Sequence, residues 1–416
     1  MHLIKILART LLLMIGTIHI TACHTSSSPE LSTTSSSADS PQQQAPYLHH
    51  VITLMGDPDG RIDTYFEDNS VATEAVEFSP NGELFASVSK SKNTSARLRL
   101  WRRSDYKMLW EQTLSGETES VAFSLDGQWI VAGGEDDLGS GVLYVFAVTN
   151  EKQVLTNLST GFSKSIEGMR FSPNGKMLAI GDEAGFVSII ATHMPNPEDW
   201  YIIGRHSVKN SADDIADVNQ VDWTSDSAYL VTAERDGDVH LYSALSLVTE
   251  YLPRPIRRYE GFTGNTVKSV RISSDNTMVA AGAGGTMGVM IWDFESAELI
   301  SHIRSEHAPR SNSAKVLNAE RYESVAFSPD SQHLVVGGTW PAWWFAANQQ
   351  ENLGYKVPLT HFDIIDLKKQ VAADAPIQFQ HYDAWRTEYI DFNTEGDLVV
   401  TGHDDGSIRL WRVNSP

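Results

Sequence analysis

Residues 121–133 read VAFSLDGQWIVAG, and variants of this phrase occur at six other places in the chain. Each copy is an apolar–x–apolar run, a Ser or Thr, a group of turn residues and a second apolar run. The other copies are VEFSPNGELFASV (76–88), MRFSPNGKMLAIG (169–181), VDWTSDSAYLVTA (221–233), VRISSDNTMVAAG (270–282), VAFSPDSQHLVVG (325–337) and IDFNTEGDLVVTG (390–402). Their central residues are 45, 48, 52, 49, 55 and 65 positions apart. A period of this size indicates a repeat architecture.

Each phrase predicts two antiparallel strands joined by a tight turn. In residues 121–133 the alternating run ends at Ser124, Asp126-Gly127 supplies the turn, and a nearly all-apolar run follows. Alternation predicts a half-exposed strand, and an unbroken apolar run predicts a strand that is buried on both faces. A third strand follows in each repeat, for example LRLW (98–101) or IRLW (408–411), and then a weaker fourth. Four strands in about 45 residues make one propeller blade.

From about residue 48 to residue 416 the chain resembles the WD-repeat β-propeller family, and the last repeat, TGHDDGSIRLW (401–411), resembles it most. The fold class that we expect is therefore all-β, a seven-bladed propeller in one domain over residues 47–416. In that family a hydroxyl, an Asp, a Trp and a His form a hydrogen-bonded network inside a blade. The resemblance assigns these positions to Thr401, Asp405, Trp411 and His381, with a structural role.

The seventh repeat contains only three strands before the sequence ends. We expect the N-terminal segment His50 to Leu54 to supply the fourth, beside Ile408 to Val413. Closing the ring from both parts of the chain would remove exposed strand edges.

The formal net charge is −21, with a pI near 5.0. This balance argues against nucleic acid, which needs a basic surface, and against electrostatic adhesion to anionic membranes. One cysteine excludes an intramolecular disulfide, and the 14 histidines show no metal-ligand spacing. We also find no nucleophile motif or phosphate loop. We therefore expect no catalytic residues, no metal and no cofactor.

The N-terminus resembles an export signal. Lys5 and Arg9 precede a ten-residue apolar run, 11–20, which is too short to span a bilayer. The next residues, Ile20 to Cys23, resemble the bacterial lipoprotein box. The resemblance implies a signal peptide over residues 1–22 and lipidation of Cys23. His24 implies outer-membrane placement, facing the periplasm. The alternative is an ordinary cleaved signal followed by an unrelated cysteine.

Residues 23–46 have the composition of a flexible tether, with eight Ser, three Thr, three Gln and no aromatic residue among 25–46. We expect the folded domain to hang from the membrane on this tether, and the lipid anchor to be its only membrane contact.

The sixth repeat contains the best candidate for a binding surface. About twenty residues separate Val335–Gly338 from Thr360–Phe362, where a short turn is expected. Aromatic residues in a long loop, together with Arg, are typical of binding hot spots. The loop into the next blade belongs to the same face. The alternative is that the insertion folds over itself as a separate small core. The partner-binding candidates are Trp340, Trp343, Trp344, Phe345, Tyr382, Trp385 and Arg386.

The function that we expect from the sequence is that of a membrane-anchored, extracytoplasmic lipoprotein. It would act as a non-enzymatic platform for protein partners of the bacterial cell envelope. The alternatives are a propeller that binds a small molecule or glycan, and a propeller enzyme whose polar residues converge on the axis of the ring.

Overall fold

The computed structural model describes residues 47–55, 72–90, 95–149, 153–154, 158, 161–208, 215–262, 264–284, 288–303, 321–341, 358–367, 381–383 and 387–414. These residues lie in a compact unit that begins at residue 44. Among them, no helix combines the length and the hydropathy needed to span a bilayer.

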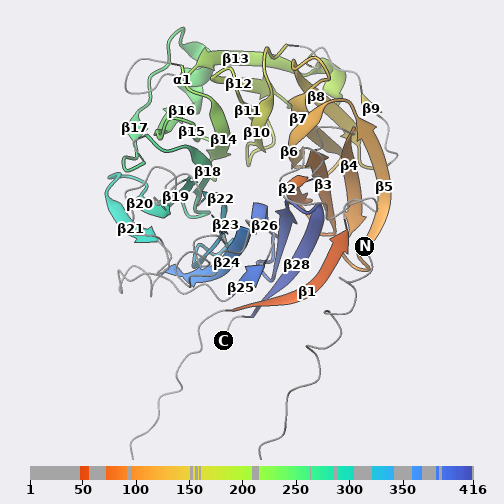
Figure 1. Cartoon of the computed structure of the whole chain (residues 1–416). Coiled ribbons are helices and arrows are strands. Elements are labelled where there is room, and N and C mark those ends of the chain that lie inside the picture. Colours follow the sequence, from red (N-terminus) through yellow and green to blue (C-terminus); the bar gives the residue numbers. More distant parts are fainter. Residues whose placement is uncertain are drawn as a thin grey trace, which may run out of the picture. The chain divides into compact units, whose positions relative to one another are not determined.

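The described residues form seven four-stranded antiparallel sheets arranged in a ring (Figure 1), which confirms the seven-bladed β-propeller. Blade one comprises β2 (Ala72–Phe78), β3 (Leu84–Lys90), β4 (Ala96–Arg102) and β5 (Lys107–Leu114). Blade two comprises β6 (Glu117–Phe123), β7 (Trp129–Glu135), β8 (Gly141–Ala147) and β9 (Gln153–Val154). Blade three comprises β10 (Ile166–Phe171), β11 (Met177–Asp182), β12 (Phe186–Ala191) and β13 (Tyr201–Ser207). Blade four comprises β14 (Val218–Trp223), β15 (Tyr229–Glu234), β16 (Val239–Ser243) and β17 (Arg257–Arg258).

The remaining blades follow the same order. Blade five comprises β18 (Val267–Ile272), β19 (Met278–Ala283), β20 (Val289–Asp293) and β21 (Leu299–Ile303). Blade six comprises β22 (Arg321–Phe327), β23 (His333–Pro341), β24 (Pro358–Asp366) and β25 (His381–Asp383), and blade seven β26 (Thr387–Phe392), β27 (Leu398–His403), β28 (Ser407–Asn414) and β1 (Tyr47–Met55). A short 3-10 helix (Pro197–Asp199) precedes β13, and α1 (Ala244–Thr249) precedes β17.

The turn inside each phrase is held by its own side chains. The Ser124 hydroxyl donates to Asp126 at 2.6 Å and accepts from the backbone N–H of Trp129 at 3.0 Å. Gly127 has φ 67°, in the left-handed region that glycine adopts without a Cβ clash. Asn276 and Ser331 hold the corresponding position at φ 56° and 57°, so the turn forms even without glycine. This repeated turn joins the first two strands of every blade.

The second strand of each blade is buried between its neighbours, as the apolar runs predict. Leu178 and Ile180 of β11 are fully buried, and so are Leu230 and Val231 of β15. These side chains pack with those of adjoining strands and blades in continuous apolar clusters. The first strand has a neighbour on one side only, because it lies at the inner end of its sheet. That position brings the first strands to the centre of the ring.

The ring is closed by β1, which confirms the expected pairing. β1 runs antiparallel to β28, with His50 opposite Trp411 and Leu54 opposite Ile408. The buried Leu48 packs in the apolar cluster that joins blades six and seven. An edge strand of blade seven is thus covered by a segment from the start of the domain.

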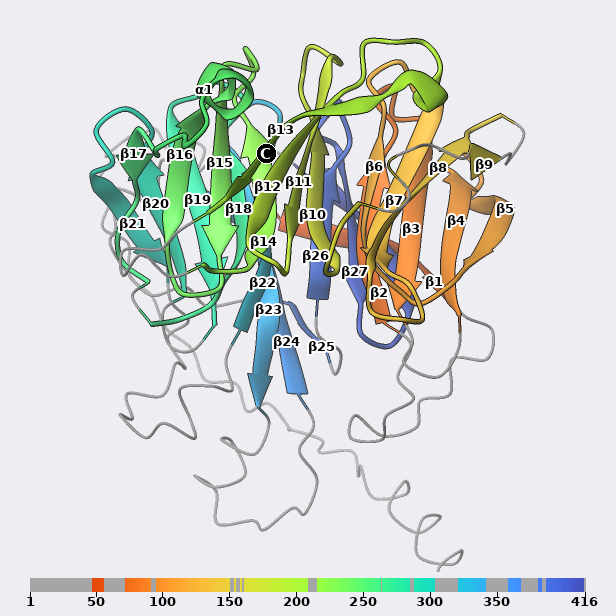
Figure 2. The ribbon, with the colours of Figure 1, turned by 90° about the horizontal axis from the view of Figure 1, so that it is seen from above.

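The two faces of the ring carry different connections (Figure 2). We call one the tether face, because β1 begins there at Tyr47, opposite Asn414 at the end of β28. It carries α1 and the turns inside the seven phrases. We call the opposite face the insertion face, because β23 ends there at Pro341.

Candidate functional site at the centre of the ring

Five of the seven inner strands carry a charged residue at one equivalent position. This is the middle residue of the apolar–x–apolar run, and from blade one to blade seven it is Glu77, Ala122, Arg170, Asp222, Arg271, Ala326 and Asp391. We did not single out these residues from the sequence. The signal that could have found them is that the same position of the phrase alternates between acid, Arg and Ala.

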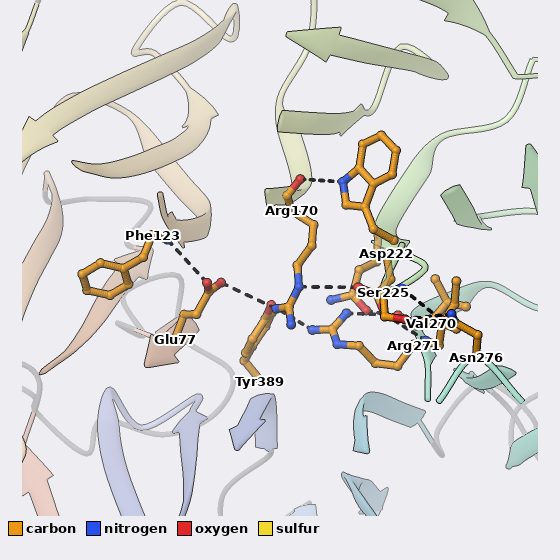
Figure 3. A network of polar contacts seen from close by, with 12 residues as sticks. Glu77, Phe123, Arg170, Asp222, Ser225, Val270, Arg271, Asn276 and Tyr389 are labelled. Atoms are coloured by element: carbon orange, nitrogen blue, oxygen red, sulfur yellow. Dashed lines mark hydrogen bonds and ion pairs between the residues drawn. The ribbon is translucent and has the colours of Figure 1, made fainter. Parts of the chain in front are cut away.

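Arg170 lies between two carboxylates from different blades (Figure 3). Its NH1 is 3.7 Å from Glu77 Oε2, and its Nε is 3.5 Å from Asp222 Oδ1. The side chains of Glu77, Arg170 and Asp222 are 13, 28 and 9 % exposed, so Arg170 still meets solvent. Arg271 extends this group of charges by donating from NH2 to the Tyr389 hydroxyl at 2.9 Å. Residues from blades one, three, four, five and seven thus meet at the centre.

The three carboxylates also accept hydrogen bonds from the next blade. Glu77 accepts from the backbone N–H of Phe123 at 3.4 Å, Asp222 from Ile272 at 2.8 Å, and Asp391 from Phe78 at 2.9 Å. The inner edge of a first strand has no neighbouring strand, so these N–H groups need other acceptors. The carboxylates supply them and join one blade to the next.

The charges at the centre largely compensate one another. Burial raises the pKa of the Glu77 carboxyl to about 7, against the effect of Arg170, and Asp391 adds to the rise. Burial also raises the pKa of Asp391. Desolvation acts against charged Arg170, but Glu77 and Asp222 outweigh it and raise the pKa of the guanidinium. Three carboxyl groups, two of them with raised pKa values, thus face two guanidinium groups.

The chemistry of this centre is that of a joint between blades. Each of the three carboxylates accepts a hydrogen bond from a backbone N–H group of the next blade. The central charges are therefore suited to holding the ring together.

A second charged group lies where the inner strands begin, near the insertion face. Lys90 pairs with Glu117 at 2.8 Å and also contacts Glu119. Burial raises the pKa of Glu167 to about 8, and the nearby Glu119 adds to the rise. This group holds more carboxylates than cations, so it lies in a field of negative potential.

Blade seven contains part of the network that the WD-repeat resemblance implied, together with His403. Trp411 Nε1 donates to Thr401 Oγ1 at 3.0 Å, and His403 Nε2 lies 2.8 Å from the same oxygen. The expected histidine, His381, is in β25, where the structure describes the backbone only. Asp405 accepts from the backbone N–H of Ser407 and pairs with Arg409 instead of joining Thr401.

Blade four has a related network, in which a carboxylate replaces the imidazole beside the threonine. Glu234 Oε1 accepts from Thr232 at 2.9 Å and lies 2.8 Å from His240 Nδ1. Asp238 completes a trio whose ligand atoms lie within 4.8 Å of one another. Arg258 pairs with Asp238, so a guanidinium already supplies positive charge there. We assign this buried trio to a structural network and not to a metal site.

The predicted partner-binding residues lie at the insertion face as far as the structure describes them. Trp340 is in β23, opposite Leu359 of β24, and Tyr382 is in β25, opposite His361. The residues Trp343, Trp344, Phe345, Trp385 and Arg386 lie outside the described residues, as does Cys23.

The long insertion that we expected in place of a short turn begins as an extension of the hairpin formed by β23 and β24. β23 and β24 pair over nine residue pairs, from His333 opposite Asp366 to Pro341 opposite Pro358. The sequence expectation placed the interruption after Gly338, whereas the strands continue three residues beyond it.

The fold and the repeated phrase define this protein as a seven-bladed β-propeller with a joint of charged residues at its centre. The family model described as WD domain, G-beta repeat matches residues 111–138, 208–243, 253–293 and 381–412. These matches support the WD-repeat family for the propeller.

Two curated relatives resemble the chain weakly. It is 23 % identical to Protein HIR1 of Candida albicans over 263 residues, which are 59 % of this chain and 27 % of that protein. It is 23 % identical to the Periodic tryptophan protein 2 homolog of Caenorhabditis elegans over 270 residues, 62 % of this chain and 24 % of that protein. The chain thus spans about a quarter of the length of these relatives.

Proposed function

We propose that this chain is a lipid-anchored, extracytoplasmic protein of the bacterial cell envelope, whose propeller is a non-enzymatic platform for a protein partner. Cys23 would carry the lipid in the outer membrane, facing the periplasm, and residues 23–46 would form the tether. WD-repeat propellers generally bind protein partners, and the four family matches support that role here.

The observation that carries the proposal is the extension of blade six. The second and third strands of the other blades have five to eight residues, whereas β23 and β24 have nine each. In Figure 2 this pair reaches farther on the insertion face than the other labelled strands. A projecting hairpin offers its strands to a partner without disturbing the ring.

The centre of the ring supports a non-enzymatic role. Its carboxylates and guanidiniums hold neighbouring blades, and burial shifts the pKa of Glu77 and Asp391 as expected for buried structural groups. Perturbed acids occur both in active sites and in structural ion-pair networks. The engagement of each acid by the next blade favours the structural one.

The experiment has two separate measurements. Mass spectrometry of the mature N-terminus tests acylation of Cys23, and unmodified Cys23 in a processed protein would contradict the anchor.

Crosslinking in intact membranes, followed by purification, tests the platform. Replacing residues 342–357 by Asn-Gly should abolish capture of the partner. A matched control, Leu138→Ala, alters an exposed residue in the corresponding turn of blade two and should retain capture. Capture by both proteins would contradict the role of blade six, and retention on a glycan without any protein partner would favour the glycan-binding alternative.

A further inference from the structure

Exposed apolar side chains are concentrated on the tether face. Eleven large apolar side chains of the described residues are strongly exposed, and only Leu138 and Ile215 of these lie at connections of the insertion face. The other nine lie in a turn inside a phrase or next to a connection between a third and a fourth strand. They are Met108, Leu109, Leu125, Tyr201, Leu245, Tyr251, Leu252, Ile256 and Leu299. Single exposed apolar residues are normal, but four of the nine, Leu245, Tyr251, Leu252 and Ile256, lie in one segment of blade four.

Blade four contributes the most prominent part of this surface. Leu245, Tyr251 and Leu252 are 70, 92 and 72 % exposed. The segment 244–256, which holds α1 and the residues after it, contains one acid and one base, Glu250 and Arg254. Its net charge is therefore zero, in a chain whose net charge is −21. The segment is apolar and uncharged overall where the rest of the protein is acidic.

The base of this segment is firmly seated in the propeller. Leu247 is 1 % exposed and packs in the apolar core between blades three and four. Its carbonyl oxygen lies 2.7 Å from Nε2 of His206 in β13. The outward side chains are therefore displayed from a fixed support, and Pro253 and Pro255 restrict the backbone that follows. The fold is formed with the side chains of Leu245, Tyr251 and Leu252 exposed.

The chain joins the propeller on the same face. Tyr47 pairs with Asn414, at the end of the third strand of blade seven, and α1 follows the end of the third strand of blade four. Cys23 is 24 residues before Tyr47. A flexible segment of that length spans roughly 25–30 Å when relaxed. A lipid on Cys23 would thus hold the tether face close to the bilayer at a high local concentration.

We propose that the tether face is a membrane-contact surface, in which Leu245, Tyr251 and Leu252 enter the headgroup region of a zwitterionic bilayer. The inference rests on the proposed lipid anchor and adds a second contact to it. Tyrosine suits this depth because its ring is apolar and its hydroxyl is polar. Partial burial of such side chains gives weak, reversible binding, which the anchor makes effective.

The lipid class follows from the charges on the same face. The turns inside the phrases carry exposed carboxylates, including those of Asp126 and Asp226. Anionic headgroups would repel them, so the contact depends on apolar insertion and not on charge attraction. This inference departs from the sequence expectation that the lipid anchor is the only membrane contact. The acidic composition argues against electrostatic adhesion, but it does not bear on apolar insertion.

The orientation that results agrees with the proposed platform. With the tether face on the bilayer, the insertion face and the hairpin of β23 and β24 point toward the periplasm (Figure 2). A soluble or membrane-spanning partner could then reach blade six.

The test uses the full, acylated protein with a single added cysteine. Cys23 is the only natural cysteine and would be blocked by the lipid, so Tyr251→Cys can be labelled with an environment-sensitive fluorophore. Leu138→Cys is the matched control, because Leu138 is 89 % exposed on the opposite face. In phosphatidylcholine vesicles that contain brominated lipid, we expect quenching at least about twofold stronger at position 251 than at position 138. Replacing part of the phosphatidylcholine by phosphatidylglycerol should not strengthen it.

The outcomes separate this inference from the proposed function. Acylated protein bound to vesicles with equal, weak quenching at both positions overturns the membrane contact and leaves the anchor intact. Crosslinking of position 251 to a protein, without quenching, overturns it in favour of a protein partner. Cys23 without a lipid overturns the anchor and this inference together. Quenching that appears only with phosphatidylglycerol overturns membrane contact by insertion of apolar side chains. A Leu245→Ser, Leu252→Ser variant that carries the label at position 251 should lose most of the quenching while its melting temperature is unchanged.

Discussion

Asp391 Oδ2 accepts a hydrogen bond from the backbone N–H of Phe78 at 2.9 Å, although 313 residues separate them in the chain. The bond joins β26 of blade seven to β2 of blade one at the centre of the ring, at the opposite edge of blade seven from the closing strand β1. It is one of three equivalent bonds, and the other two acceptors are Glu77 and Asp222. The position that looks like a spacer in the repeated phrase is therefore a point of attachment between blades.

Asp391→Ala should destabilise the propeller by about 1–3 kcal/mol, because the N–H of Phe78 loses its acceptor in a buried setting. Asp391→Asn keeps an acceptor and should lose less. The free energy of unfolding from urea titration measures both. Glu395→Ala, which removes a half-exposed carboxylate from the neighbouring turn, is the control. Equal losses for Asp391→Ala and Glu395→Ala would contradict the role of the bond.

The stability should fall as the pH rises from about 4.5 to about 7. The pKa of Glu77 is about 7 in the folded protein, above its ordinary value of 4.5, so the folded state binds more protons than the unfolded state between these values. The stabilising contribution of protonated Glu77 is complete below the unfolded pKa and is lost as the pH rises through the folded pKa. Glu167, whose folded pKa is about 8, should extend the decline.

Glu77→Gln should reduce this slope, since the side chain no longer titrates. Urea titrations at a series of pH values give the measurement, and Glu83→Gln in an exposed turn is the control. A slope that is the same in Glu77→Gln and in the parent protein would show that Glu77 does not titrate in this range.

Removing the closing strand should unfold the domain at a much lower temperature. A chain that starts at residue 60 lacks β1, so the edge of β28 and the apolar cluster around Leu48 become exposed. Leu48→Ala should cost about 2–5 kcal/mol, as expected for a truncated core residue. The exposed Thr53→Ala in the same strand is the control. The closing pair would be rejected if the shortened and the full domain melted at the same temperature.

The hydrogen bond between Trp411 and Thr401 should stabilise blade seven and should not contribute to binding of the partner. Thr401→Val leaves the Trp411 N–H without its acceptor in a buried site, which should cost about 1–3 kcal/mol. Trp101 donates to Ser87 in the same way in blade one, so Ser87→Ala provides a matched comparison. Double-mutant cycles with Trp→Phe give the pairwise term for each blade. A coupling energy near zero in both blades would contradict a structural role for these hydrogen bonds.

The blade count, the strand order within a blade and the closing strand could all be predicted, because they depend on local patterns. Alternation, turn residues and a missing fourth strand are visible in the printed sequence. The central network of charged residues could not be predicted, because the apolar–x–apolar pattern does not show which residues meet across a ring. Glu77 and Arg170 are in blades one and three, and only the closed ring brings them to 3.7 Å.

The histidine beside Thr401 could have been predicted from the spacing of residues within one strand. Residues i and i+2 of a strand share a face, so His403 is placed next to Thr401 by β27 itself. Thr232 and Glu234 repeat this spacing in β15. The resemblance to the WD-repeat family pointed to His381 because that family takes its histidine from a preceding loop. The spacing inside the strand identifies His403 as a histidine that contacts Thr401, while the role of His381 stays a prediction.

Trp343→Ala together with Trp344→Ala should abolish capture of the protein partner and leave the melting temperature nearly unchanged. If these side chains serve a partner, the seven blades do not depend on them, and aromatic side chains are frequent binding hot spots. Crosslinking from membranes measures capture, and calorimetry measures melting. Leu138→Ala, on the same face in blade two, should alter neither. A large drop in the melting temperature of the double variant would instead assign the insertion to a small core of its own, and blade six would then lose its claim to be the binding surface.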